Sequence, residues 1–210
     1  MDIAPFLPGF IAAYAILLVG ASSPGPSVAM LIGVATGEGR APALIATAGI
    51  ALGSATINIL TMLGVGLLLS HAAWAMTGLR IIGAAYLLYL AWGAFKKMRN
   101  PPDLEPLNVK RRNAWRHFMV GYLLQVTNPK AIAFWLAIAS IGATAGGGIG
   151  IILLFIAGAC TISFVCHGAW AMAMSARPIR TAYAHARRWI EGALGAFFVF
   201  AAYKLATTKV

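Results

Sequence analysis

Hydrophobic residues are concentrated in six stretches of the chain, and short segments rich in glycine, proline or charge separate them. Each stretch has about the 20 residues that a helix needs to cross the hydrocarbon core of a bilayer. The pattern therefore predicts an all-α integral membrane protein with six transmembrane helices. The predicted spans are residues 6–36, 41–69, 73–95, 118–141, 149–175 and 189–206.

The connections between these spans differ in length and in charge. Only residues 96–117 form a long connection, and its prolines and charges exclude a further span. Residues 176–188 carry four arginines, and we expect a short interfacial helix there. Twelve lysines and arginines follow the first, third and fifth spans, against three on the opposite side. By the positive-inside rule, this asymmetry predicts a cytoplasmic loop at 96–117 and both termini outside.

Proline interrupts the first and the fourth predicted spans at similar positions in the two halves of the chain. The sequence reads SSPGPS at residues 22–27 and TNPK at residues 127–130. A proline inside a helix removes one backbone hydrogen bond, so both helices should be broken. Because each half has three spans, the second half enters the membrane from the opposite side. We therefore expect one transporter domain, residues 1–210, with two inverted three-helix repeats at about 1–99 and 117–210.

The composition agrees with a membrane location. Hydrophobic residues make up 60% of the chain, charged residues 10%, and the mean hydropathy is +0.82. A soluble domain has about a quarter charged residues. The net charge of +11 does not indicate nucleic-acid binding, because the basic residues lie between spans. The N-terminal segment has Asp2 and no basic region, so we expect no cleaved signal peptide.

Lys130 is the most unusual residue in this hydrophobic pattern. It lies roughly 15–18 Å from the start of the fourth span at 1.5 Å per helical residue, near the bilayer midplane. A lysine at this depth costs about 2.5–3.5 kcal/mol on insertion scales. We therefore expect a functional partner to face its ammonium.

Three motifs together resemble the LysE/RhtB family of bacterial amino-acid exporters. They are PGP at 24–26, GAAYLLYLAWGAFKKMR at 83–99 and GYLLQVTNPKAIAFW at 121–135. The resemblance covers nearly the whole chain and implies an inner-membrane carrier that exports amino acids, driven by an ion gradient and not by ATP. Ser54 departs from the family pattern, because several relatives have an acid there, and the resemblance does not name the amino acid.

The broken helices suggest how such a substrate would bind. Half-helices that begin inside the protein direct their N-terminal N–H groups and positive dipole ends at a common point, which favours an anion. For an amino acid this anion is the α-carboxylate, and Lys130 adds a full positive charge. The candidate substrate-binding residues are Ser23, Pro24, Gly25, Pro26, Ser27, Asn58, Gln125, Asn128, Pro129 and Lys130.

The acidic residues limit the substrate class. Of five acids, only Glu191 lies within a span, one turn from its cytoplasmic edge. The sequence thus predicts no midplane carboxylate for a cationic side chain, which favours a neutral zwitterionic amino acid. A proton is the expected coupling ion, with Lys130 as the candidate carrier. The parts of His167 and Glu191 in coupling stay open, as does homo-oligomerisation within the lipid membrane.

Two alternative functions share part of the pattern. A membrane thiol-disulfide conduit also uses a six-span inverted repeat, but it needs cysteines on the broken helices. A divalent-metal exporter needs soft ligands, and Cys160, Cys166 and His167 provide at most a partial site in one span. Because the cysteines lack a CxxC spacing, we expect no metal site or cofactor. No histidine or acid is expected at the depth of the serines, so a nucleophile would lack a base, and we expect no enzymatic activity.

Overall fold

Every regular element in the described part of the chain is helical, as the hydrophobic pattern predicts. The structure is a computed structural model that describes residues 2–71, 73–101 and 113–207. The elements are η1 (Ala4–Phe6), α1 (Leu7–Ser22), α2 (Pro26–Gly37), α3 (Arg40–His71), α4 (Ala73–Arg99), α5 (Ala114–Val126), α6 (Pro129–Ala139), α7 (Ile149–Met174) and α8 (Arg177–Thr207).

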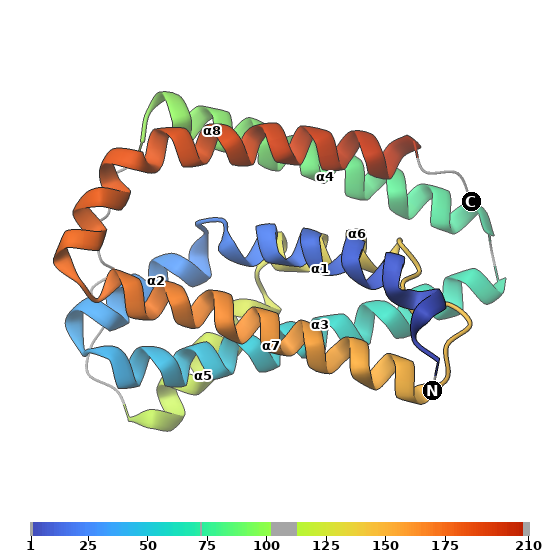
Figure 1. The fold of residues 1–210 in the computed structure, drawn as a ribbon, viewed down its shortest axis with the longest axis horizontal. Coiled ribbons are helices and arrows are strands. Elements are labelled where there is room, and N and C mark those ends of the chain that lie inside the picture. The colour runs from blue at the N-terminus through green and yellow to red at the C-terminus, as the bar shows by residue number, and fades with distance from the viewer. Residues whose placement is uncertain (1, 72, 102–112, 208–210) are drawn as a thin grey trace.

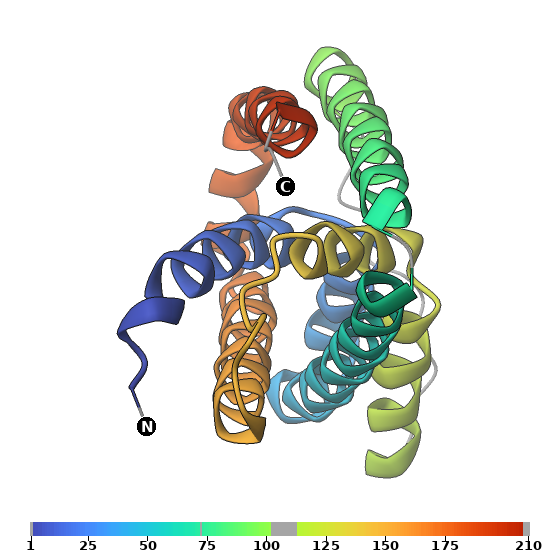
Figure 2. The same cartoon turned by 90° about the vertical axis from the view of Figure 1, so that its right-hand side faces the viewer.

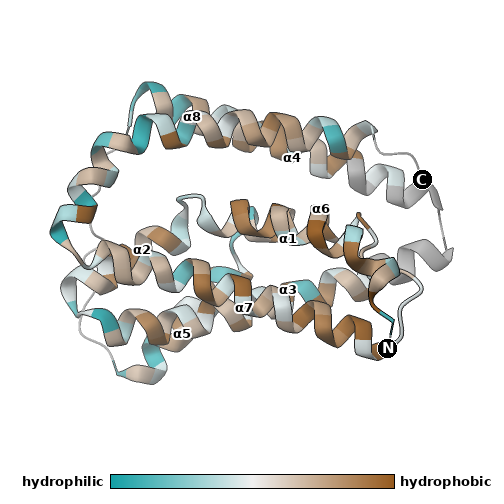
Figure 3. Cartoon of the chain, viewed as in Figure 1, coloured by the Kyte–Doolittle hydropathy of each residue, from teal (hydrophilic) through white to brown (hydrophobic). Residues whose placement is uncertain are grey.

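The helices run back and forth between the two ends of an elongated bundle (Figure 1). α1 and α2 together make one pass along the bundle, and so do α5 and α6, whereas the other long helices each make a pass alone. The beginning of α1 and the end of α8 lie at the same end of the bundle. Hydrophilic residues gather at the opposite end, where α4 finishes with Lys96, Lys97 and Arg99 (Figure 3).

Both predicted proline breaks are present. α1 ends at Ser22 and α2 begins at Pro26, while α5 ends at Val126 and α6 begins at Pro129. A proline in the first turn of a helix costs no helical hydrogen bond, because the N–H it lacks would have no partner there. Proline also disfavours helical geometry in the residue before it, and Gly25 and Asn128 are extended accordingly. Local sequence therefore places four helix ends inside the bundle.

The helices form three layers when the bundle is viewed from its end (Figure 2). α4 packs along α8 in one outer layer, α1 and α6 lie in the middle, and α3 packs against α5 and α7 on the other side. The crossing of α3 and α5 depends on two glycines. A Cβ at Gly49 would lie 2.0 Å from the carbonyl oxygen of Phe118, and one at Gly121 would lie 2.1 Å from that of Ala46. Only glycine permits this close approach of backbones.

Four stretches of described helix are long and apolar enough to cross a membrane: Ala4–Ser22, Arg40–Gly64, Ile149–Met174 and Arg177–Thr207. The shorter apolar helices α2 and α6 each follow a break. Large apolar side chains such as Leu63, Ile81 and Trp92 are exposed on the outside of the bundle. An apolar exterior of this kind is typical of a surface that faces lipid.

The last helix differs from the prediction. Residues 177–188 do not form a separate interfacial helix, because α8 is continuous from Arg177 to Thr207 and bends within its N-terminal part (Figure 1). Pro178 occupies the second helical position, where proline is tolerated. The alanines and arginines that follow are good helix formers. No residue in this local sequence ends the helix before the hydrophobic span that was predicted at residues 189–206.

Candidate functional site

The ammonium of Lys130 lies where the two breaks meet. Its Nζ donates one hydrogen bond to the backbone oxygen of Ser23 at 2.9 Å and another to Ser23 Oγ. Ser23 Oγ in turn donates to the carbonyl of Gly20 at 3.0 Å. These bonds use two of the three N–H donors of the ammonium, which leaves one for a further acceptor. The break in one half of the chain thus holds the cation that the other half supplies.

The N-terminus of α2 lies beside this ammonium. A Cβ at Gly25, the N-cap residue of α2, would lie only 3.3 Å from Lys130 Nζ. No side chain caps α2, whereas its main chain continues normally through the bond from Ala29 N–H to the Gly25 carbonyl. A helix N-terminus carries a partial charge of about +0.5. The full and the partial positive charges therefore converge on one point, and an anion is favoured there.

A chain of hydrogen bonds connects buried polar side chains across the two breaks. Asn128 Oδ1 accepts from the backbone N–H of Lys130 at 3.0 Å and thereby caps α6. Asn128 Nδ2 donates to Ser27 Oγ at 3.4 Å, and Ser27 Oγ donates to Gln125 Oε1 at 2.9 Å. The sequence predicts that the N-termini of α2 and α6 both face an anion. The N-terminus of α6 is already capped by Asn128, whereas the N-terminus of α2 has no side-chain cap.

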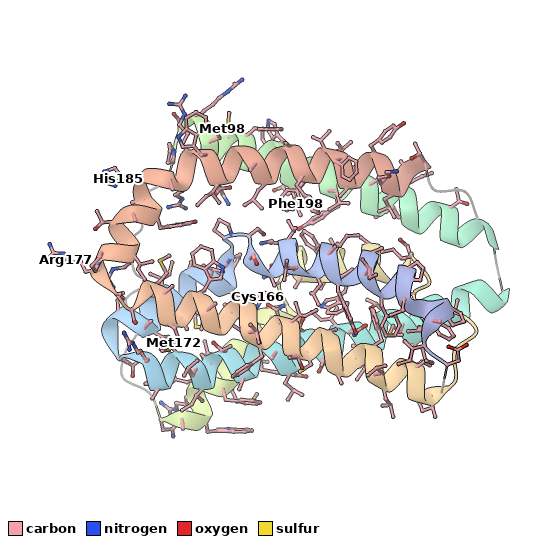
Figure 4. All side chains as sticks on the ribbon, viewed as in Figure 1. Met98, Cys166, Met172, Arg177, His185 and Phe198 are labelled. Atoms are coloured by element: carbon pink, nitrogen blue, oxygen red, sulfur yellow. The ribbon has the colours of Figure 1, made fainter. Side chains whose placement is uncertain are left out.

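These polar groups line a small cavity of about 40 Å³. Of the predicted site residues, the cavity brings together Ser23, Gly25, Ser27, Gln125, Asn128 and Lys130. A buried water needs roughly 10–15 Å³ on this measure, so the cavity holds about three waters. Phe134 forms part of its wall and packs edge to face on Phe198, with ring centroids 5.7 Å apart. Phe198 belongs to α8 (Figure 4). The site is closed to anything larger in this conformation.

Four polar lining residues were not among the predicted site residues: Ser54, Trp135, Ser163 and His167. Trp135 Nε1 donates to Ser54 Oγ at 3.0 Å. His167 Nδ1 lies 2.8 Å from the carbonyl oxygen of Ser163, so Nδ1 must carry a proton. In the neutral ring, Nε2 is then an acceptor. The spacing of four between Ser163 and His167, two polar residues on one face of an apolar helix, was the available sequence signal.

The remaining predicted residues lie outside this cavity. Pro24, Pro26 and Pro129 shape the breaks and do not line it, and Asn58 lines a different cavity. In this structure Asn58 therefore lies apart from Lys130, and its part in substrate binding stays a prediction. Asn58 follows Ser54 by four residues on α3, so it faces the same side of the helix but lies one turn, about 6 Å, further along.

Glu191 is more central than its sequence position suggested. It is 2% exposed, and its charge interacts with those of Lys97, Arg187 and Lys130. Its Oε1 has no hydrogen-bond partner among the described residues. A carboxylate therefore lies within electrostatic range of the site after all. Three cations of the protein already interact with this carboxylate, so a further cation would compete with them for it.

No observation favours the two alternative functions. Cys160 and Cys166 are free thiols, and Cys160 Sγ donates to the backbone oxygen of Ala51 at 3.8 Å. Within the described residues, no three histidine, cysteine, aspartate or glutamate side chains are grouped so that they hold a metal ion. Neither cysteine lies on a broken helix, as a thiol-disulfide conduit would need.

Comparison with known proteins gives one family. The family model described as LysE type translocator matches residues 18–209. The chain is 26% identical over 201 residues to the threonine efflux protein of Escherichia coli strain K12, covering 90% of this chain and 93% of that protein. It is also 26% identical over 181 residues to the uncharacterized membrane protein YahN of the same organism, covering 85% and 81%.

A third relative matches over a shorter stretch. It is the uncharacterized membrane protein PA4757 of Pseudomonas aeruginosa, 34% identical over 118 residues. This match spans 54% of each chain, so it covers about half the length of that relative. No solved structure matches the chain.

Proposed function

The chain belongs to the LysE type translocator family, and from that premise we propose that it is a secondary-active exporter of amino acids or their derivatives in the bacterial inner membrane. One observation carries this proposal. The ammonium of Lys130, supplied by one half of the chain, is held at the break of the other half and beside the uncapped N-terminus of α2. Secondary transporters bind substrate at such discontinuous helices.

We propose a zwitterionic amino acid with an uncharged side chain as the substrate. Its carboxylate would accept the third N–H of Lys130 and the free N–H groups of α2. Its ammonium would donate to Gln125 Oε1 and His167 Nε2, both of which belong to side chains that line the same cavity. Glu191 already interacts with three cations of the protein. Threonine is the first candidate to test, since several relatives are named threonine efflux protein.

The passes of the described helices support a proposal for the arrangement in the membrane. We propose that the six passes are six crossings, with α1–α2 and α5–α6 as broken spans, in two inverted repeats of one domain at about 1–99 and 117–210. The basic end of the bundle would face the cytoplasm, so both termini would lie outside. A proton is the proposed coupling ion, and Lys130 is its proposed carrier.

Efflux from cells preloaded with labelled amino acids tests this function. Cells that express the protein should lose threonine, serine or leucine faster than cells with an empty vector, and the difference should collapse when the proton gradient is dissipated. If no amino acid leaves faster, the exporter assignment is wrong. If lysine and arginine alone leave faster, the argument from compensated carboxylates is wrong while export itself stands.

A further inference from the structure

A second and larger cavity lies beyond the Lys130 cavity. Its volume is about 470 Å³, against about 40 Å³ for the Lys130 cavity. α3, the end of α6, the connection after it and the first turns of α7 form its wall. Nearly all of this wall is apolar, including Met62, Ile138, Ile152 and Phe155. Asn58 brings an amide into this apolar surrounding.

The two cavities lie in line along the same three helices. On α3 the small cavity touches Ser54 and the large one touches Asn58; on α6 the corresponding residues are Trp135 and Ile138. On α7, which runs in the opposite direction, the small cavity touches Ser163 and the large one lies at 149–156. Every step leads toward the end of the bundle where α1 begins (Figure 1). In the proposed orientation this end is the outside of the cell.

Trp135 separates the two cavities. Its side chain is 2% exposed, and its indole N–H is fixed by Ser54 Oγ at 3.0 Å. It belongs to a core cluster that also contains Ile57 and Ala159, which lie between the residues of the two cavities along α3 and α7, and Phe155, which lines the outer cavity. This layer of packed apolar side chains blocks the direct path from the Lys130 cavity to the outer cavity.

Asn58 is the polar group that the packing of the outer cavity does not explain. It is 1% exposed, and neither Nδ2 nor Oδ1 has a hydrogen-bond partner in the described part of the chain. Buried side-chain amides almost always have partners, so an amide with two unsatisfied atoms is a place where a ligand or a water can bind. An amide offers a donor and an acceptor together. These two groups match the carboxylate and the ammonium of a zwitterion, and the apolar wall suits an uncharged side chain.

We propose that the Asn58 cavity is a second binding station for the exported amino acid, which the substrate enters from the Lys130 site when the Trp135–Ser54 contact opens. This inference rests on the proposed function. The two stations divide the path into a small inner site that selects by charge and a larger outer site that selects by hydrogen bonding. Asn58 is assigned to the outer station alone.

A cysteine reporter in the outer cavity tests the proposal. Cys160 and Cys166 are replaced by serine, and Ala143→Cys places one thiol in the wall of the cavity. In nanodiscs, L-threonine and L-leucine should slow the reaction of this thiol with a small methanethiosulfonate reagent. The slowing should be about tenfold at ten times the half-protecting concentration. Leu60→Cys is the matched control, because Leu60 is 63% exposed on α3 and does not line the cavity.

Two further variants separate this station from the Lys130 site. Asn58→Leu removes an unpaired buried amide at similar volume, so it should fold, as thermal unfolding will check, and it should raise the half-protecting concentration about tenfold. Asn58→Ala removes the same amide and serves as a second variant with the same expected result. Lys130→Met should stop efflux yet keep protection of the Ala143→Cys thiol.

The outcomes distinguish the two proposals. Protection that is the same in Asn58→Leu and the parent overturns the station, and so does protection that disappears with Lys130→Met. A thiol that is unreactive with or without amino acid and becomes reactive when lipid is extracted also overturns it, because the occupant is then a lipid chain. Failure of the parent protein to export any amino acid in cells refutes the exporter function instead.

Discussion

Replacing Lys130 by methionine removes the ammonium and keeps the length of the side chain. The variant loses the two hydrogen bonds from Nζ to Ser23. Hydrogen bonds of charged groups contribute about 1.5–3 kcal/mol each. Removing a charge near the bilayer midplane recovers about 2.5–3.5 kcal/mol. These terms partly offset each other, so we expect the free energy of unfolding to fall by no more than about 3.5 kcal/mol.

Transport should respond much more strongly than stability. Loss of one partner from a buried charge pair costs about 2–5 kcal/mol, which corresponds to a factor of about 30 or more in affinity. We therefore expect efflux by Lys130→Met at limiting substrate to fall at least about 30-fold. Efflux from proteoliposomes and thermal unfolding in detergent, measured on the same preparations, separate the two effects.

Two further variants serve as controls for this experiment. Lys96→Met removes a lysine at the end of α4 that does not line the cavity, so it should keep wild-type efflux. Lys130→Arg keeps the charge and should keep part of the activity. Full efflux by Lys130→Met would refute the role of the ammonium in substrate binding. Loss of folding in Lys130→Met but not in Lys130→Arg, with unchanged efflux per folded molecule, would assign the lysine a structural role instead.

Three other predictions follow from particular contacts. Gly25→Ala places a methyl group 3.3 Å from the position of the ammonium, so efflux should drop about tenfold with little change in melting temperature, and unchanged efflux would contradict the geometry. Gly49→Ala forces a methyl group to 2.0 Å from a carbonyl of α5 and should destabilise by about 3 kcal/mol, whereas Gly168→Ala, with its nearest atom at 3.7 Å, should melt like the parent. In a cysteine-free background, cysteines at Asn108 and Lys209, which lie outside the described residues, should be labelled only from the cytoplasm and only from outside, respectively; the reverse pattern would invert the orientation.

The breaks could be predicted from sequence because their causes are local. Pro26 and Pro129 fix the first turn of α2 and of α6 and exclude helical geometry in the residues before them. The convergence of Ser23 and Lys130 needed one further step, the expectation that the paired broken helices of a transporter meet at a central site. These residues line one cavity in the structure.

The surroundings of Asn58, Trp135 and Glu191 could not be predicted from sequence, because they depend on how each helix is rotated and which helix packs beside it. Asn58 and Ser54 share a face of α3, yet Trp135 binds Ser54 and divides the space between them. Glu191 was placed by its distance from a span edge. In the structure α8 starts earlier and bends, and this brings the carboxylate among the cations of other helices.

The structure also constrains how the substrate would move. The Lys130 cavity is small, with Phe134 and Trp135 in its wall, and both of these residues belong to α6, which is separated from α5 at Thr127 and Asn128. Motion of this short helix about its break would displace both aromatic side chains without unfolding a long helix. The same motion would carry the backbone of Lys130 away from Ser23. The motion of one helix would therefore both release the Lys130 ammonium from Ser23 and open the Lys130 cavity toward the outer cavity. An exporter of the proposed kind requires that these two events are coupled.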